Sequence, residues 1–186
     1  MPNLYVALLH YPVVNKAGEK IASAVTNLDL HDISRAAKTY GVNQFYVVTP
    51  LTDQLNLVKR IAAHWLEGAG AAYNPNRRDS MSLIRAVDSF GTAVESIAAL
   101  EGQIPKTIVT SAKENRRCIG FEAARELLKN QAPYMLVFGT AWGLAEEILM
   151  SADYVLEPIE GNTGYNHLSV RSAAAVILDR LVGKKE

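Results

Sequence analysis

Cysteine is almost absent from this sequence, which has only Cys118 among its 186 residues. An intramolecular disulfide needs two cysteines, so none can form, and a zinc site made of several cysteines is excluded as well. This usage suits a reducing compartment, and we expect the protein in the cytoplasm. The four histidines stand singly, and no metal-binding spacing occurs, so we expect no bound metal.

Long apolar runs and an excess of one charge are missing too. No apolar stretch approaches the roughly 20 residues that span a bilayer, so we expect no membrane association. The first residues, Met1-Pro2-Asn3, lack the positive segment of a signal peptide. Lysine and arginine total 19, as do aspartate and glutamate. Any nucleic-acid binding must therefore come from a local patch or a dimer surface.

Three common catalytic signatures are also absent. The first apolar run is not followed by Gly-x-Gly-x-x-Gly, and the sequence has neither a Walker A lysine motif nor a Gly-x-Ser-x-Gly elbow. Their absence weakens a dinucleotide-binding, P-loop or serine-hydrolase interpretation.

Short apolar, β-branched runs alternate with longer segments of helical spacing, which predicts an α/β fold with a mostly parallel sheet of about six strands flanked by helices. We expect one domain over residues 1–186, with loose stretches at His10–Asn27 and Gly70–Ser80. A turn-forming cluster, Asn74–Arg78, lies in the second. The predicted strands are Leu4–Leu9, Gln44–Thr49, Ser82–Val87, Thr107–Thr110, Tyr134–Phe138 and Asp153–Leu156, and the predicted helices are Asp29–Tyr40, Leu51–Gly68, Phe90–Leu100, Gly120–Asn130 and Leu168–Val182.

The segment Val137–Glu147 is a candidate ligand loop. An apolar strand runs into a loop with two glycines, and a helix follows. Glycine lets a ligand approach the main chain closely, and ligands of open α/β sheets lie beyond the carboxyl ends of strands. The alternative is a tight strand-to-helix turn, in which Glu146 and Glu147 favour the helix start.

Two further segments could carry function. In Val155–Val170 a strand enters a polar loop longer than most strand-to-helix connections, and long ordered loops often bind ligands. The alternative is a surface excursion in which Asn166 or Ser169 caps the last helix. In Thr107–Lys113 a strand ends in hydroxyl side chains, for which the alternative is a solvated loop.

Taken in this order, the three segments resemble the SPOUT methyltransferases, whose C-terminal half carries three cofactor loops. The first is similar to Thr110–Ala112, the second (Phe-Gly…Gly-Leu) to Phe138–Leu144 and the third to Pro158–Ser169. The N-terminal half resembles the family's Asn-x-x-Arg…Gly…Pro-Leu pattern, with Asp32–Arg35, Gly41 and then Thr49-Pro50-Leu51. The resemblance covers nearly the whole chain.

The resemblance implies a trefoil knot, S-adenosylmethionine as cofactor, RNA (tRNA or rRNA) as substrate and a homodimer. It gives Arg35 a role in RNA binding or catalysis, whereas a solvated or salt-bridged helix residue is the alternative. Backbone groups of Gly139, Gly143, Ile159 and Leu168 would hold adenine and ribose. The cofactor-binding residues that it implies are Thr110, Ser111, Phe138, Gly139, Thr140, Gly143, Leu144, Glu157, Pro158, Ile159, Gly161, Tyr165, Asn166, His167, Leu168 and Ser169.

Two departures from the family pattern stand out. Only three residues, Thr140-Ala141-Trp142, separate Phe-Gly from Gly-Leu, where four including a glutamate are common, and His167 replaces the usual asparagine. With these departures, the sequence resembles a separate bacterial branch of RNA methyltransferases whose target position is not assigned.

Methyl transfer to a nucleotide needs an aligned acceptor, a proton acceptor and positive surface for phosphates. Asp32, Glu157 and Glu160 are candidates for the proton acceptor, and the alternative favoured for each is a structural or solvated carboxylate. Trp142 and Tyr165 could stack on bases, although core or interface packing is the alternative for Trp142. Candidate basic patches are Lys113 with Arg116 and Arg117, and Arg77 with Arg78.

Two other functions compete with RNA methyl transfer. One is a catalytically silent domain that binds S-adenosylmethionine and serves as an RNA-interaction module, which the balanced charge and the altered second loop favour. The other is a different α/β nucleotide-binding enzyme without a knot.

Overall fold

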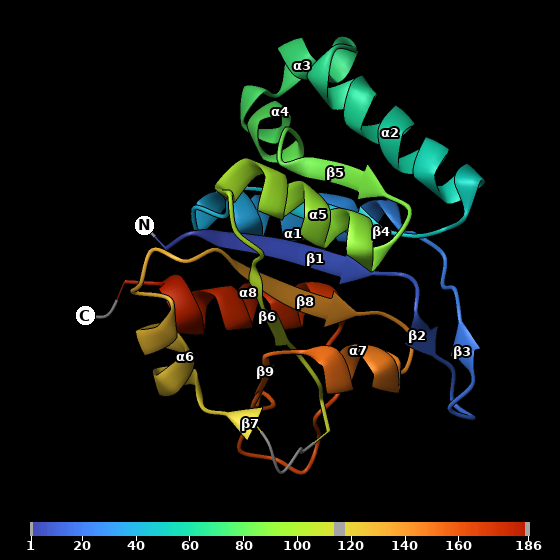
Figure 1. Cartoon of the computed structure of the whole chain (residues 1–186). Coiled ribbons are helices and arrows are strands. Elements are labelled where there is room, and N and C mark those ends of the chain that lie inside the picture. Colours follow the sequence, from blue (N-terminus) through green and yellow to red (C-terminus); the bar gives the residue numbers. More distant parts are fainter. Residues whose placement is uncertain (1, 114–117, 185–186) are drawn as a thin grey trace.

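The computed structural model describes residues 2–113 and 118–184. Its centre is a seven-stranded sheet (Figure 1) in which every pair of neighbouring strands is parallel. The predicted parallel sheet and its six predicted strands are confirmed, and the seventh is the two-residue strand β7, too short for a periodic signal. In spatial order the strands are β5 (Ile84–Val87), β4 (Phe45–Val48), β1 (Leu4–Leu9), β8 (Tyr134–Gly139), β6 (Lys106–Val109), β9 (Tyr154–Leu156) and β7 (Cys118–Ile119).

Eight helices lie in the described part of the chain. They are α1 (Asn27–Thr39), α2 (Thr52–Leu66), α3 (Ala69–Tyr73), α4 (Pro75–Met81), α5 (Phe90–Glu101), α6 (Phe121–Leu127), α7 (Glu146–Ser151) and α8 (Val170–Val182).

The helices cover both faces of the sheet, which explains why the strands are apolar on both sides. Leu4, Val6 and Leu8 of β1 pack into one core cluster with residues of α1, α6 and α8. The β1 residues between them point to a second cluster with α5 and α7. Figure 1 shows α5 in front of the sheet and α1 behind it. A strand buried on both faces needs apolar residues at every position, and β1 has such a continuous apolar sequence.

The two stretches expected to be loose are partly ordered. His10–Asn27 contains an antiparallel hairpin of β2 (Val13–Val14) and β3 (Lys20–Ile21). The second stretch, Gly70–Ser80, contains most of α3 and α4, so its interpretation as a loop was wrong. Its Asn-Pro pair starts a helix instead: the Asn74 side chain accepts from the Arg77 backbone N–H at 3.0 Å, and Pro75 occupies the first turn of α4.

None of the described helices is long and apolar enough to cross a membrane. The last helix begins at Val170 rather than Leu168, because the Ser169 hydroxyl caps it by accepting from the Ser172 backbone N–H at 3.3 Å. Glu146 and Glu147 lie in the first turn of α7, as their sequence position indicates.

Candidate functional site

A cavity of about 700 Å³ opens at the carboxyl ends of β6, β8 and β9. All three predicted cofactor loops contribute to its wall, together with the hairpin and the start of α1. The predicted residues that line it are Thr110, Ser111, Phe138, Gly139, Thr140, Gly143, Leu144, Glu157, Ile159, Asn166, His167, Leu168 and Ser169. Pro158, Gly161 and Tyr165 are not among the lining residues.

A second hollow, of about 560 Å³, lies on the opposite edge of the sheet. Its wall includes Asn3 and Asn43, which stand just before β1 and β4, so it lies at the amino ends of the strands. Parallel α/β sheets bind ligands at the carboxyl ends of their strands. The cavity at the three loops is therefore the candidate site.

The loop after β8 is tight. A Cβ atom on Gly139 would lie 2.8 Å from the Leu144 backbone nitrogen, and Gly143 has φ 114°, which side chains rarely adopt. The hairpin holds this loop in place, since Val14 donates to the Gly143 carbonyl and accepts from the Trp142 backbone N–H, both at 3.0 Å. This loop is one residue shorter than the pattern with which the sequence was compared, and the two hydrogen bonds to Val14 hold it in its tight conformation.

Trp142 does not pack in the core of the chain. It lines the cavity with 59% of its surface exposed, so this part of its expected packing is wrong. Tyr165 is exposed too, at 72%, and its ring meets that of His167 edge to face with centroids 6.4 Å apart. Both rings are therefore open to a partner.

The first and third loops lie side by side at the cavity. The Asn166 side chain donates to the Ala112 carbonyl at 3.2 Å, and the Thr110 hydroxyl donates to the Val137 carbonyl at 3.0 Å. Residues 161–169 are exposed, and the last four of them, Asn166–Ser169, form part of the cavity wall. Apolar walls from Phe138, Leu144 and Ile159 with polar groups between them suit a nucleoside such as adenosine.

Among the proposed proton acceptors, Glu157 is occupied. Its Oε1 accepts from the Phe121 backbone N–H at 2.7 Å and satisfies the start of α6, which no residue caps from the usual position. Glu160 is exposed and does not line the cavity. The side chain of Asp32 is 48% exposed, and its Oδ2 lies 3.7 Å from Nε of Arg171.

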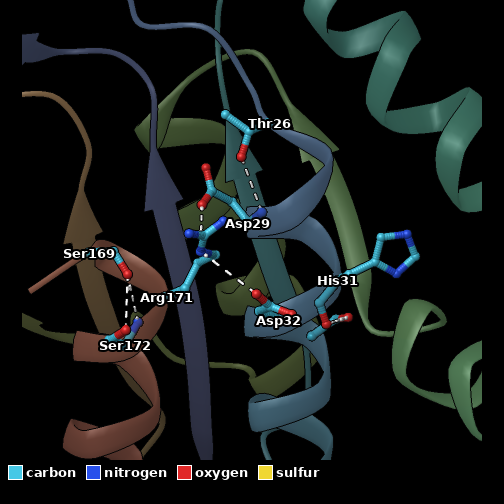
Figure 2. Close-up of polar contacts among 8 residues, drawn as sticks. Thr26, Asp29, His31, Asp32, Ser169, Arg171 and Ser172 are labelled. Atoms are coloured by element: carbon cyan, nitrogen blue, oxygen red, sulfur yellow. Dashed lines mark hydrogen bonds and ion pairs between the residues drawn. The ribbon is translucent and has the colours of Figure 1, made fainter.

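A carboxylate and a guanidinium that the sequence did not single out lie at the cavity mouth. Asp29 of α1 lines the cavity, and its Oδ1 lies 3.8 Å from Nε of Arg171 in the first turn of α8 (Figure 2). The expected catalytic Arg35 is exposed on α1 and is not part of the cavity wall. No sequence signal joins Asp29 to Arg171, because they lie in opposite halves of the chain.

The expected basic patches are only partly visible at the site. Lys113 lines the cavity, whereas Arg116 and Arg117 lie outside the described residues. Arg77 stacks over the Trp65 ring at 4.7 Å, and Arg78 lies 3.5 Å from Asp79 on the surface. Within residues 2–113 and 118–184, no three His, Cys, Asp or Glu residues are grouped to hold a metal ion.

A chain of polar side chains connects a buried histidine to the cavity wall. His10, with no exposed surface, has Nδ1 2.9 Å from the Ser23 hydroxyl, which lies 2.5 Å from the Thr140 hydroxyl. Nε2 of His10 has no hydrogen-bond partner among the described residues. Burial lowers the pKa of His10 to about 4, although Asp29 nearby opposes this shift. His10 is thus a neutral positioning group for the Thr140 loop.

This histidine predicts an acid-sensitive fold. Unfolded chains protonate His10 near its ordinary pKa of 6.5, whereas the folded chain takes up that proton only near pH 4. Stability is therefore lost as pH falls through this window, by at most about 2 kcal/mol between pH 6.5 and pH 5. Urea denaturation at pH 7 and pH 5 measures it. His10→Gln is expected to reduce the loss, and an unchanged pH dependence would contradict this assignment.

Two solved structures share this architecture. One, described as a probable methylase family protein from Haemophilus influenzae, matches with a TM-score of 0.64 and 22% identity, covering 97% of this chain and 65% of that one. The TrmH/SpoU tRNA modifying enzyme of Aquifex aeolicus matches with a TM-score of 0.56 and 19% identity, covering 97% of this chain and 74% of that one. The fold is that of the SPOUT methyltransferases.

The family follows from the sequence. A family model described as SAM-dependent RNA methyltransferase matches residues 3–183, and the chain belongs to this family. S-adenosylmethionine is accordingly its cofactor, as the resemblance implies, and the interpretation as an unrelated nucleotide-binding enzyme is wrong. The trefoil knot stays a prediction that family membership supports.

Two relatives differ in length. A tRNA (guanine-N(1)-)-methyltransferase of Oleidesulfovibrio alaskensis is 45% identical over 181 residues, which are 97% of this chain but 42% of that protein. An uncharacterized protein of Aquifex aeolicus is 37% identical over 183 residues, covering 98% of this chain and 89% of that one. The chain thus spans less than half of the named tRNA methyltransferase.

Proposed function

We propose that this chain transfers the methyl group of S-adenosylmethionine to a nucleotide in tRNA, in the cavity at the ends of β6, β8 and β9. The observation that supports it most is the convergence of three loops on one cavity, with Gly139 and Gly143 in its wall. The cofactor supplies a methyl group on a sulfonium. The protein's part is to hold it in line with the acceptor atom.

tRNA is the proposed RNA because the relative of Oleidesulfovibrio alaskensis is named for a tRNA reaction. More than half of that protein lies outside the match, so its guanine specificity is not assigned to this chain. A methylated guanine is only the first product to look for. Trp142 and Tyr165, exposed beside the cavity, are the proposed stacking partners for an unpaired base. Lys113 is the proposed phosphate contact.

We further propose that residues 1–186 act as one domain in a cytoplasmic homodimer, with Arg35 on the RNA side. One sheet supports both core clusters, which favours a single domain. Family resemblance and the exposed apolar side chains of Leu100 and Ile104 favour the dimer. Light scattering is expected to give twice the mass of the chain.

The experiment is methyl transfer from radiolabelled S-adenosylmethionine to total tRNA from a strain that lacks this gene, with total rRNA and wild-type tRNA as controls. We expect incorporation into the unmodified tRNA alone, and mass spectrometry of its nucleosides identifies the product, with 1-methylguanosine examined first. Incorporation into rRNA would mean that rRNA, and not tRNA, is the substrate. Cofactor binding without transfer to any RNA would instead show a catalytically silent RNA-interaction module.

A further inference from the structure

The mouth of the cavity is built from the first turns of two helices that lie side by side (Figure 2). Thr26 caps α1 by accepting from the Asp29 backbone N–H at 3.2 Å, and Ser169 caps α8. The caps fix where each helix begins. They therefore fix the two side chains in those first turns, Asp29 and Arg171, on one side of the opening.

Asp29 is unusual for a carboxylate. It is 8% exposed, yet it belongs to the cavity wall, so the residue is largely buried and still borders the site. Aspartate is rarely this buried unless a positive group is near, and Arg171 supplies it. The helix start adds a favourable field for a negative charge. The site therefore keeps a carboxylate beside the place where a methyl acceptor must enter.

The pairing with Arg171 leaves capacity unused. The Nε–Oδ1 separation of 3.8 Å and the 3.7 Å to Asp32 are ion-pair distances and not hydrogen bonds. In the described part of the chain neither Asp29 oxygen accepts a side-chain hydrogen bond. Arg171, shared between two carboxylates, holds Asp29 by charge from outside and leaves its oxygens open to a donor in the cavity.

Other acidic or basic groups are less well placed. Oε1 of Glu157 is used by the start of α6, and Glu160 lies off the cavity. Asp32 is half-exposed and is not among the lining residues. His10 lies behind the wall with Nδ1 against Ser23. Asp29 alone among these combines burial, access to the cavity and a free oxygen.

We propose that Asp29 is a catalytic residue that takes the proton of the acceptor nucleotide, and that Arg171 is a positioning residue for its carboxylate. This inference rests on the proposed function. The acceptor atom forms a bond to the methyl carbon, the carbon–sulfur bond breaks, and its electron pair goes to sulfur to give S-adenosylhomocysteine. The proton of the acceptor goes to Asp29 and from there to water, so charge and atoms balance.

A carboxylate base suits some acceptors more than others. A base nitrogen that carries a proton loses it more readily than a ribose hydroxyl, because its acidity is closer to that of the carboxylate. The pair therefore favours a ring N–H as acceptor. The charged or titratable groups that lie near Asp29 are Arg171 from α8, Asp32 from α1 and His10 after β1.

The test compares Asp29→Asn with Asp32→Asn, a matched change one turn along α1 beside the same arginine. With saturating deletion-strain tRNA, Asp29→Asn is expected to lower kcat by about 100- to 10,000-fold, the usual contribution of a general base. The S-adenosylhomocysteine affinity of Asp29→Asn, measured by calorimetry, is expected to stay within about threefold of the wild-type value. Asp32→Asn is expected to lower kcat by less than about tenfold. Asp29→Glu keeps the carboxylate and is expected to retain more activity than Asp29→Asn.

The pH profile separates a chemical role from a structural one. The wild-type rate is expected to rise with pH until the base is ionised, and Asp29→Asn is expected to lose this limb. Arg171→Lys is expected to shift the limb, because the lysine charge cannot contact both carboxylates alike. Full activity in a folded Asp29→Asn with normal cofactor binding, or an unshifted limb in Arg171→Lys, would overturn the inference. A wild-type protein that binds cofactor but methylates no RNA would overturn the proposed function itself.

Discussion

Gly139→Val is expected to weaken S-adenosylhomocysteine binding by up to about 100-fold, since forced overpacking costs up to about 3 kcal/mol and each 1.4 kcal/mol is tenfold. A Cβ atom at this position would lie 2.8 Å from the Leu144 backbone nitrogen and 2.9 Å from its Cγ. The leucine side chain can move aside, but the backbone atom cannot without shifting the loop. Isothermal titration of the purified variant measures the change.

Two further variants serve as controls for the binding measurement. Gly91→Ala lies in α5, where the added Cβ meets only the Ser89 hydroxyl at 3.8 Å, so binding is expected to stay at the wild-type value. Gly143→Ala adds no clash but places a side chain at φ 114°, and a smaller loss is expected. Wild-type affinity in a folded Gly139→Val would mean that the ligand lies elsewhere.

Phe138→Ala is expected to destabilise the fold by about 3–5 kcal/mol, the usual loss for a buried phenylalanine. Phe138 is the last residue but one of the central strand β8. It is 1% exposed and belongs to the larger core cluster, although it also lines the cavity. For a chain of this size, such a loss lowers the melting temperature by about 6–20 °C. Urea denaturation measures the free energy directly.

A matched exposed residue separates this from a general loss of side-chain area. Leu28 on α1 is 59% exposed, and Leu28→Ala is expected to change stability by less than about 0.5 kcal/mol. If Phe138→Ala cost less than about 1 kcal/mol, the packing of β8 against the helices would differ from the structure described here.

The sheet could be predicted because burial on both faces leaves a strong mark. Leu4–Leu9 and Tyr134–Phe138 are continuous apolar runs, and they became β1 and β8 with their predicted positions nearly unchanged. Glycines at the end of such a run also marked the loop correctly. By contrast, Asn74 and Pro75 are common both in turns and at the start of helices, and local sequence cannot separate the two.

The site was less predictable where it depends on distant parts of the chain. Asp29 and Arg171 meet only because α1 and α8 begin at the same edge of the sheet, and each alone is an ordinary charged helix residue. Arg35, expected from its motif position, lies farther along α1 and faces outward. His10 gave no sequence signal, since its burial follows from the hairpin that folds over it.

The sequence departures now have a structural setting. The short second loop closes with a hydrogen bond from the Gly143 backbone N–H to the Thr140 carbonyl at 3.0 Å, and the hairpin braces it from outside. No glutamate is present in that loop, and a different carboxylate, Asp29, faces the cavity from α1. The cavity thus keeps an acidic group although the expected one is missing.

The most direct test of the cofactor site is isothermal titration of S-adenosylhomocysteine into the purified chain, with ATP and NAD as comparison ligands and Gly139→Val alongside. The account predicts one site per chain for S-adenosylhomocysteine, no measurable binding of ATP or NAD, and loss of the site in the variant. Absence of S-adenosylhomocysteine binding in the folded wild-type chain, or equal binding of ATP or NAD, would contradict the assignment of this cavity.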